Sequence, residues 1–216
     1  GSTTLALGNV RTLATGNVGL TNTVLTGGNA TYQDNLNVVA TSTNAKLSFA
    51  NPANLVAGNS GNVVVTAASA GSLTGTANLA LTSKVLAGTT GLNDVALAGQ
   101  TVAVTGAAYD YGNAVIADTT VAFGNIHLGS AVVTRNLSVA NTTITSATYQ
   151  DNLTATATAV TGLSVNTLSE MVAGSSGNLV FSASSAAAGS LAGSVNFSLN
   201  STNTVSGLDA KTLATT

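Results

Sequence analysis

Short runs in which apolar and polar residues alternate recur along the whole chain. Clear examples are Thr76–Thr82, Thr101–Thr105 and Ser194–Asn200, each bounded by Gly, Asn or Ser. Alternation with a period of two is typical of strands with one buried and one exposed face, and breaks at roughly 10- to 15-residue intervals favour an antiparallel sandwich. The predicted strands cover residues 3–8, 16–25, 32–41, 45–50, 62–69, 74–83, 95–106, 119–124, 132–141, 149–159, 161–166, 178–185 and 192–201.

The chain also repeats itself. Tyr32–Leu36 recurs as Tyr149–Leu153, and other matched blocks keep an offset of 116 to 119 residues. This period is one domain rather than one rung of a solenoid, which spans about 20 to 50 residues. The Gly, Asn and Thr content leaves a β-helix open as an alternative. We predict an all-β fold of two tandem sandwiches, residues 1–112 and 113–216, with a hinge at 107–118 in which two Tyr pack between the domains.

Composition excludes several classes of function. Charged residues make up 6% of the chain, where about 25% is ordinary, and the formal net charge is −2. Five scattered basic residues cannot neutralise a run of phosphates, so we expect no nucleic-acid binding. There is no Cys and one His, His127, so neither a thiolate nor a His-cluster metal site is available. No apolar run is long enough to cross a bilayer as a helix.

A family resemblance rests on the start of each repeat. The second copy contains Val121-x-Phe123-Gly124-Asn125-x-x-x-Gly129, then Leu137-x-Val139-x-Asn141. The first copy has a weaker version in Leu5, Leu7, Gly8 and Asn9, then Val18, Leu20 and Asn22. This pattern resembles the tandem immunoglobulin-like domains of the ASH and choice-of-anchor D kind, which occur in bacterial surface proteins. The resemblance implies a seven-stranded sandwich with a surface or adhesive role and no catalysis.

The second copy is shorter than the first at its closing strand. Gly207–Thr216 aligns with Gly91–Gln100, so Thr101–Gly106 has no counterpart. A sandwich without that strand has an open sheet edge beside an apolar groove, and such an edge is a template for pairing. One reading is that the chain is a slice of a longer protein, and the other is β-strand addition by another subunit. The predicted donor is Thr4, Leu5, Ala6 and Leu7, and the predicted groove flank is Val195, Phe197, Leu199, Leu208 and Leu213.

Other candidate chemistry is weak. The carboxylates are dispersed, and Asp34 and Asp151 recur at one place per copy, which indicates a turn or strand-start role rather than a calcium site. A self-made Lys–Asn cross-link would need a nearby acid, and Glu170 is the only Glu, with none in the first copy. The six Asn-x-Ser/Thr sequons, at Asn29, Asn136, Asn141, Asn152, Asn196 and Asn200, match what the composition yields by chance. We therefore expect no catalytic residue, no bound metal and no cofactor.

The sequence thus predicts a structural protein rather than an enzyme. We expect an extracellular bacterial filament or surface layer whose subunits join head to tail by strand addition. The alternative is a spacer fragment of a large anchored adhesin that is monomeric alone. A carbohydrate-binding module would need aromatic platforms, and four dispersed Tyr do not provide them.

Overall fold

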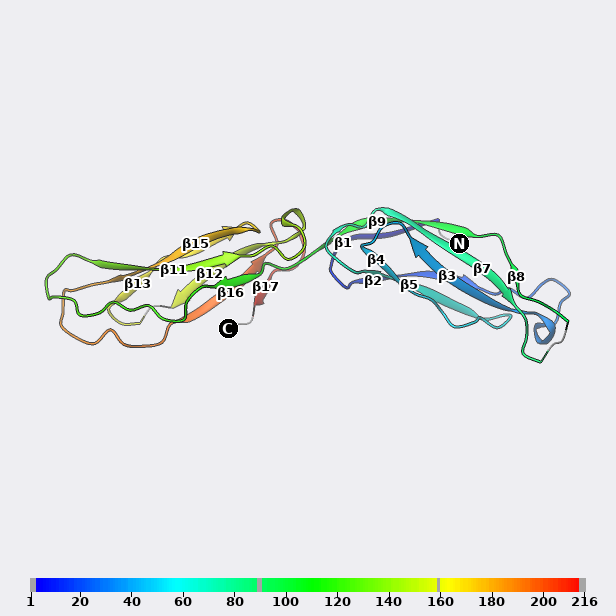
Figure 1. Cartoon of the computed structure of the whole chain (residues 1–216), viewed down its shortest axis with the longest axis horizontal. Helices are drawn as coiled ribbons and strands as arrows, with labels where there is room; N and C mark the ends of the chain where they lie inside the picture. The colour runs from blue at the N-terminus through cyan, green and yellow to red at the C-terminus, as the bar shows by residue number, and fades with distance from the viewer. Residues whose placement is uncertain (1–2, 89–90, 159, 214–216) are drawn as a thin grey trace. The chain divides into compact units, whose positions relative to one another are not determined.

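A computed structural model describes residues 3–88, 91–158 and 160–213 of the 216-residue chain (Figure 1). The all-β architecture predicted from alternation is confirmed. The chain divides into two compact units, Gly1–Ala108 and Tyr109–Thr216. The sequence repeat places the boundary a few residues later, at 112/113. Within the described residues, no helix is both long and apolar enough to span a membrane.

The first unit contains two sheets. One has the order β1-β9-β7-β3, with β6 pairing β9 and β8 pairing β7, and the other has the order β2-β5-β4. The elements are β1 (Thr4–Arg11), β2 (Thr15–Thr21), η1 (Ala30–Tyr32), β3 (Asn35–Ser42), β4 (Leu47–Ala50), β5 (Ser60–Ala67), β6 (Gly71–Ser72), β7 (Gly75–Lys84), β8 (Val95–Ala96) and β9 (Gln100–Tyr109).

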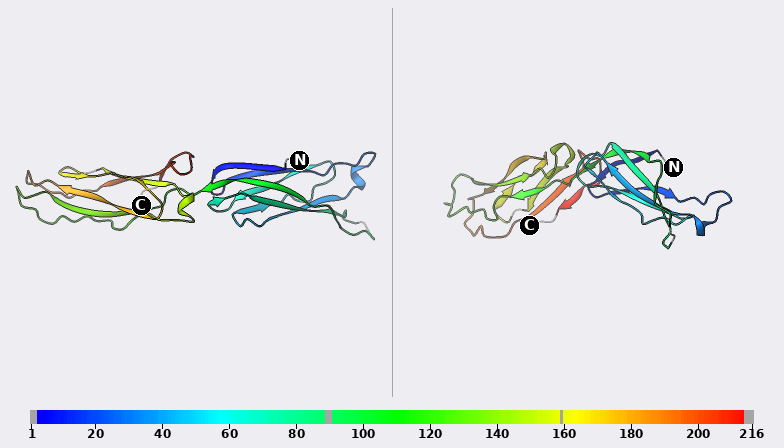
Figure 2. Two further views of the ribbon diagram at one scale, coloured as in Figure 1. Left: turned by 90° about the horizontal axis from the view of Figure 1, so that it is seen from above. Right: turned by 45° about the vertical axis from the view of Figure 1, so that its right-hand side comes forward.

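The second unit also contains two sheets, with orders β10-β11-β15-β13 and β14-β12-β16-β17. Its elements are β10 (Ala114–Ile116), β11 (Val133–Asn141), η2 (Ala147–Tyr149), β12 (Asn152–Thr158), β13 (Leu163–Val165), β14 (Leu168–Met171), β15 (Ser175–Ala183), β16 (Asn196–Thr202) and β17 (Lys211–Leu213). Figure 2 shows the strands of each unit from two further sides.

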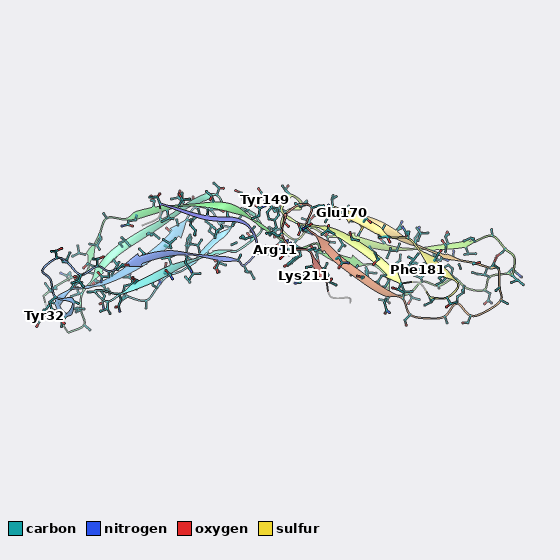
Figure 3. The ribbon with its side chains drawn as sticks, turned by 180° about the vertical axis from the view of Figure 1, so that it is seen from behind. Arg11, Tyr32, Tyr149, Glu170, Phe181 and Lys211 are labelled. Atoms are coloured by element: carbon teal, nitrogen blue, oxygen red, sulfur yellow. The ribbon has the colours of Figure 1, made fainter. Side chains whose placement is uncertain are left out.

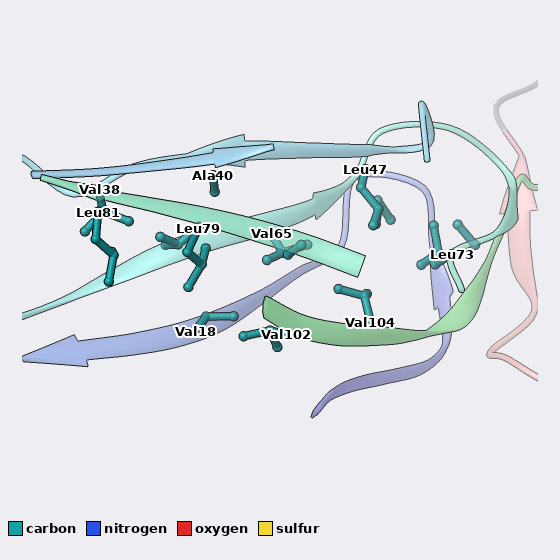
Figure 4. Close-up of a cluster of buried hydrophobic side chains, with 14 residues drawn as sticks. Val18, Val38, Ala40, Leu47, Val65, Leu73, Leu79, Leu81, Val102 and Val104 are labelled. Atoms are coloured by element: carbon teal, nitrogen blue, oxygen red, sulfur yellow. The ribbon is translucent and has the colours of Figure 1, made fainter. Parts of the chain in front are cut away.

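Alternation places one face of each strand in a core. In β5, Val63, Val65 and Ala67 are fully buried while the residues between them are half-buried, as the period-two pattern requires. These side chains pack against Leu79 and Val104 from the opposite sheet (Figure 4). Burying one aliphatic side chain of this size contributes about 1.5–3 kcal/mol. The core of the second unit is built the same way around Leu137, Val139, Leu153, Leu179, Phe181 and Leu199.

Two sequence-based expectations require correction. Residues 119–124 were expected to form a strand, but the structure assigns none between Ala117 and Val132. The counterpart of this segment, β1, pairs with β9 in the first unit, and the described part of the second unit offers no such partner. Residues 107–118 were expected to be a hinge. Instead, β9 continues to Tyr109, Asp110 pairs with Gln150, and β10 follows.

Candidate strand-acceptor site of the second unit

The closing strand of the first unit shows what its counterpart would do in the second. β9 pairs with β7 from Gly75 opposite Val104 to Leu79 opposite Gln100. It also lies next to β1, where the amide of Ala103 donates to the carbonyl of Thr3 at 2.9 Å, and next to β6. β9 therefore lies between β1 and β7 in the sheet and also pairs with β6.

In the second unit, the strand that follows β16 occupies a different position. β17 pairs with the far end of β16, Leu199 opposite Leu213 and Ser201 opposite Lys211. This is the place that β8 takes in the first unit, where Ser83 lies opposite Val95. β17 is thus the counterpart of β8 and not of β9.

One stretch of the sheet edge is consequently open. The counterpart of Gly75–Leu79 is Gly193–Phe197, of which Asn196 and Phe197 begin β16 and Gly193–Val195 precede it outside any strand. Among residues 3–88, 91–158 and 160–213 no strand pairs with this stretch on the side that β9 would take. On its other side, Phe197 lies opposite Ala157 of β12. We call Gly193–Phe197 the open edge.

A groove lies where the far half of a β9-like strand would run. Its volume is about 860 Å³, and it is lined by Val121, residues 123–126, Leu128, Thr161, Gly162 and residues 184–192. The wall at Gly189–Leu191 is the counterpart of β6 and Leu73, which β9 covers in the first unit. Leu73 is fully buried there, whereas Leu191 is half-buried in the groove wall.

Two glycines, Gly8 in β1 and Gly106 in β9, show how closely these two strands approach each other. In the first unit, a Cβ added at Gly106 of β9 would lie 2.5 Å from the carbonyl oxygen of Gly8. Gly106 also has a φ of 143°, which side chains rarely adopt, so the contact requires glycine. Gly124 is the counterpart of Gly8, and a Cβ added to either residue meets nothing within 4 Å, so the close contact at this position involves the backbone alone.

The structure brings only some of the predicted flank residues to the open edge. Val195 and Phe197 lie on it and pack partly buried against the core. Leu199 and Leu213 lie opposite each other, where β17 has already closed the edge. Leu208 belongs to the loop before β17, where its amide donates to the Ser206 hydroxyl.

The predicted donor lies in the first unit. Thr4, Leu5, Ala6 and Leu7 form the start of β1 next to β9. Leu5 and Leu7 pack against the first core, and their side chains reach within 3.2 Å and 2.6 Å of the Cβ position of Gly16. This segment could act as a donor only by leaving β9.

A buried polar cluster holds one end of the second unit together. The side-chain amide of Asn141 donates to the carbonyls of Asp151 and Met171, and its oxygen accepts from Gln150 at 2.9 Å and from the Asn113 amide at 2.8 Å. The buried Asp151 carboxylate accepts from the amide and hydroxyl of Ser206. Asn141 is fully buried, so its sequon cannot carry a sugar in the folded protein.

The first unit repeats part of this cluster. Asn22 donates to the carbonyls of Asp34 and Leu55, and Gln33 donates to the Asn22 oxygen at 3.0 Å. The recurring Asp was expected to serve a turn or strand start, but in both units the Asn and Gln side chains make most of the bonds. The signal available in the sequence was the recurrence of Asn22 as Asn141 together with the Tyr-Gln-Asp-Asn block.

The remaining candidates are dispersed over the surface. His127 is exposed, and its carbonyl accepts from the Ser130 amide in a turn. The Asp94 carboxylate pairs with Lys84, whose hydrogen bond lowers the pKa of Asp94. No group of three or more His, Asp or Glu side chains gathers within the described ranges in a way that could hold a metal ion.

Glu170 joins three strands at the surface. One of its carboxylate oxygens accepts from Thr204 at 2.7 Å and from Asn152 and Thr202 at 3.1 Å each (Figure 3). The Thr204 hydroxyl is the largest cause of a lowered Glu170 pKa, followed by the Asn152 amide. The Glu170 carboxylate is therefore hydrogen-bonded to two hydroxyls and one side-chain amide.

The hydrogen bonds of Glu170 predict an acid-dependent contribution to stability. Because its pKa is lowered in the folded state, the contribution is present above the unfolded-state pKa of about 4.3 and is lost as the pH falls through the folded-state value. We expect Glu170→Gln to cost less than about 1 kcal/mol at pH 7, because the site is exposed, and to cost less at pH 3 than at pH 7. Chemical denaturation at both pH values measures this, with Asp118→Asn at an exposed position as the control. An equal cost at both values would contradict the prediction.

No protein-family model matches the chain, and no curated protein matches it.

Proposed function

We propose that the chain is a structural subunit of an extracellular bacterial filament or surface layer, built from two immunoglobulin-like units that join head to tail by β-strand addition. The observation that carries the proposal is the open edge at Gly193–Phe197 beside the groove. Unpaired backbone groups along a sheet edge offer hydrogen bonds to an incoming strand, and half-buried side chains beside it offer apolar area.

The first unit defines the strand that the site would take. β9 presents Val102 and Val104 to the core, 5% and 0% exposed, and Gly106 to the backbone of Gly8. By the pairing of β9 with β7, an incoming strand should therefore place two aliphatic side chains opposite Val195 and Gly193 and bring a glycine next to Gly124. Thr4–Leu7 supplies the two aliphatic residues, Leu5 and Leu7, whereas Asn9 would then take the place of Gly106.

The low charge of the chain bears on how such an assembly behaves. Seven acidic and five basic residues in 216 leave a surface of mostly Thr, Asn and Ser. Backbone pairing and apolar contact are little screened by ions. Filaments formed in this way should therefore persist from low to moderate salt.

Electron microscopy and size-exclusion chromatography of the purified chain test the proposal. Fibres, or mass that grows with concentration, are expected. A monomer at every concentration overturns the polymer and leaves the adhesin spacer, which would expose the same edge when separated from its neighbours.

A cysteine pair tests which strand is the donor. The chain has no native Cys. If Leu5 and Leu7 take the places of Val102 and Val104, Ala6 lies opposite Ser194, because Ala103 lies opposite Thr76. Ala6→Cys with Ser194→Cys should then give a ladder of covalent oligomers on a non-reducing gel. Ala6→Cys with Ser164→Cys, at an exposed position on β13, is the matched control. Equal ladders in both variants would exclude this donor.

A further inference from the structure

The segment that leads into the second unit covers one surface of that unit. We call Tyr109–Ala117 the lead-in segment. Asp110 pairs with Gln150: its amide donates to the Tyr149 carbonyl at 2.9 Å, and its carbonyl accepts from the Asp151 amide at 3.1 Å. The rings of Tyr109 and Tyr149 lie 5.5 Å apart.

The lead-in segment then adds a strand to the neighbouring sheet. Asn113 donates its amide to the Asn141 side chain and accepts from the Thr142 amide at 2.9 Å. β10 follows, pairing Ala114 with Asn141 and Ile116 with Val139 of β11. Ala114 and Ile116 pack against the core, and Val139 is fully buried beneath this strand.

The first unit has the residues that receive this segment. Tyr32, Gln33 and Asp34 correspond to Tyr149, Gln150 and Asp151, and the end of β2 at Leu20–Asn22 corresponds to Val139–Asn141. The side-chain bonds between Asn and Gln are the same in both units. In each unit the Gln side-chain oxygen also accepts a hydrogen bond from the loop that precedes the Gln. The donor is the amide of Leu25 in the first unit and of Ile144 in the second.

In the first unit these receiving groups are uncovered. Tyr32 is 84% exposed, whereas Tyr149 is half-buried. Leu20 and Asn22 are half-buried, whereas Val139 and Asn141 are fully buried. Within the ranges that the structure describes, β2 is an edge strand with β5 as its pairing partner, and nothing takes the place of β10.

We infer that this surface of the first unit, Leu20–Thr23 with Tyr32–Asp34, is a second acceptor site. Its occupant is the lead-in segment of a neighbouring unit of the same kind, an extended chain with the pattern of Tyr109–Ala117. The second unit shows the occupied state of the same residues, so the chemistry of the partner is defined: a Tyr to pack on Tyr32, an Asn to bond Asn22, and two small or aliphatic side chains to cover Leu20. This site lies on the first unit and is independent of the open edge proposed above.

A graft tests the inference in the full chain. Thr119 corresponds to Thr3, so a second copy of the sequence of residues 109–118 is placed directly before Thr3, replacing Gly1 and Ser2. Tethering gives the grafted segment a high effective concentration at the site. We expect amide hydrogen exchange at Leu20–Thr23 and Asp34 to slow at least 10-fold.

The control graft carries Asn113→Ala and Ile116→Asp in the grafted copy alone and should leave exchange as in the natural chain. In the active graft, Tyr32→Ala should lose roughly two- to tenfold of the protection, because an aromatic pair contributes about 0.5–1.5 kcal/mol. Leu25→Ala, 72% exposed in the same loop, should lose none. Equal exchange in the two grafts, or protection at other residues instead, overturns the inference. Hydrogen exchange at Leu20–Thr23 and Asp34 is measured on the first unit. The fibre experiment tests the open edge of the second unit, so its outcome does not change this measurement.

Discussion

Asn141→Ala is expected to destabilise the second unit by about 3–4 kcal/mol. The substitution removes four hydrogen bonds at a fully buried site and leaves the carbonyls of Asp151 and Met171 without their side-chain donor. It also removes the acceptor of the Gln150 side chain and of the Asn113 amide. Each buried group left without a partner costs about 1–3 kcal/mol, and the total falls below the sum because the cluster relaxes together.

Asn22→Ala is the matched control for this prediction. Asn22 makes the equivalent bonds to Asp34, Leu55 and Gln33, but it is half-buried, so water can replace part of what is lost. We expect a cost of about 1–2 kcal/mol, confined to the first unit. Hydrogen exchange read by peptide mass spectrometry in mild denaturant reports each unit separately. Equal losses at the two positions would contradict the role of burial.

Phe181→Ala is expected to cost the second unit about 3–5 kcal/mol. Phe181 is 1% exposed and belongs to the core of the second unit (Figure 3), and Val121 and Phe123, which pack against this core, also line the groove. The loss combines the transfer free energy of the ring with the cavity left behind, because packed neighbours relax only in part. A substantial fraction of the unit's stability would be removed, since whole domains are stable by about 5–15 kcal/mol.

Val65→Ala in the first unit tests the same position with a smaller side chain. Val65 is fully buried and corresponds to Phe181 in the repeat. A loss of about 2 kcal/mol is expected there. Val172→Ala, at a 57% exposed site, should change stability by less than about 0.5 kcal/mol. Denaturant unfolding followed by exchange of each unit gives all three values, and a loss below 2 kcal/mol for Phe181→Ala would show that the second core is loosely packed.

Alternation predicted the long strands well and the short ones poorly. β5 and β7 lie where the period-two runs at 62–69 and 74–83 placed them. β10, β14 and β17 have three or four residues each, too few for a period to show. The segment 119–124 has the apolar pattern of a strand, yet a strand also needs a neighbour, and the pattern of one segment cannot reveal whether its partner is present.

The candidate site was predicted in part for the same reason. The repeat alignment placed Gly207–Thr216 opposite Gly91–Gln100, and the pairing of β17 with β16 agrees with that alignment residue by residue. It did not foresee that Leu213 closes the edge at Leu199, nor that Leu5 and Leu7 are packed on Gly16. Those facts depend on which segments meet in three dimensions.

The two uncovered surfaces differ in kind, and this has a consequence for symmetry. Among the described residues, the surface beside β16 lacks a counterpart of β9, and the surface beside β2 lacks a counterpart of β10. A twofold dimer would fill these surfaces only if its two copies exchanged segments reciprocally, because like surfaces cannot fill each other. An array that grows by one-way donation is instead polar, with a leading and a trailing terminus that are chemically distinct.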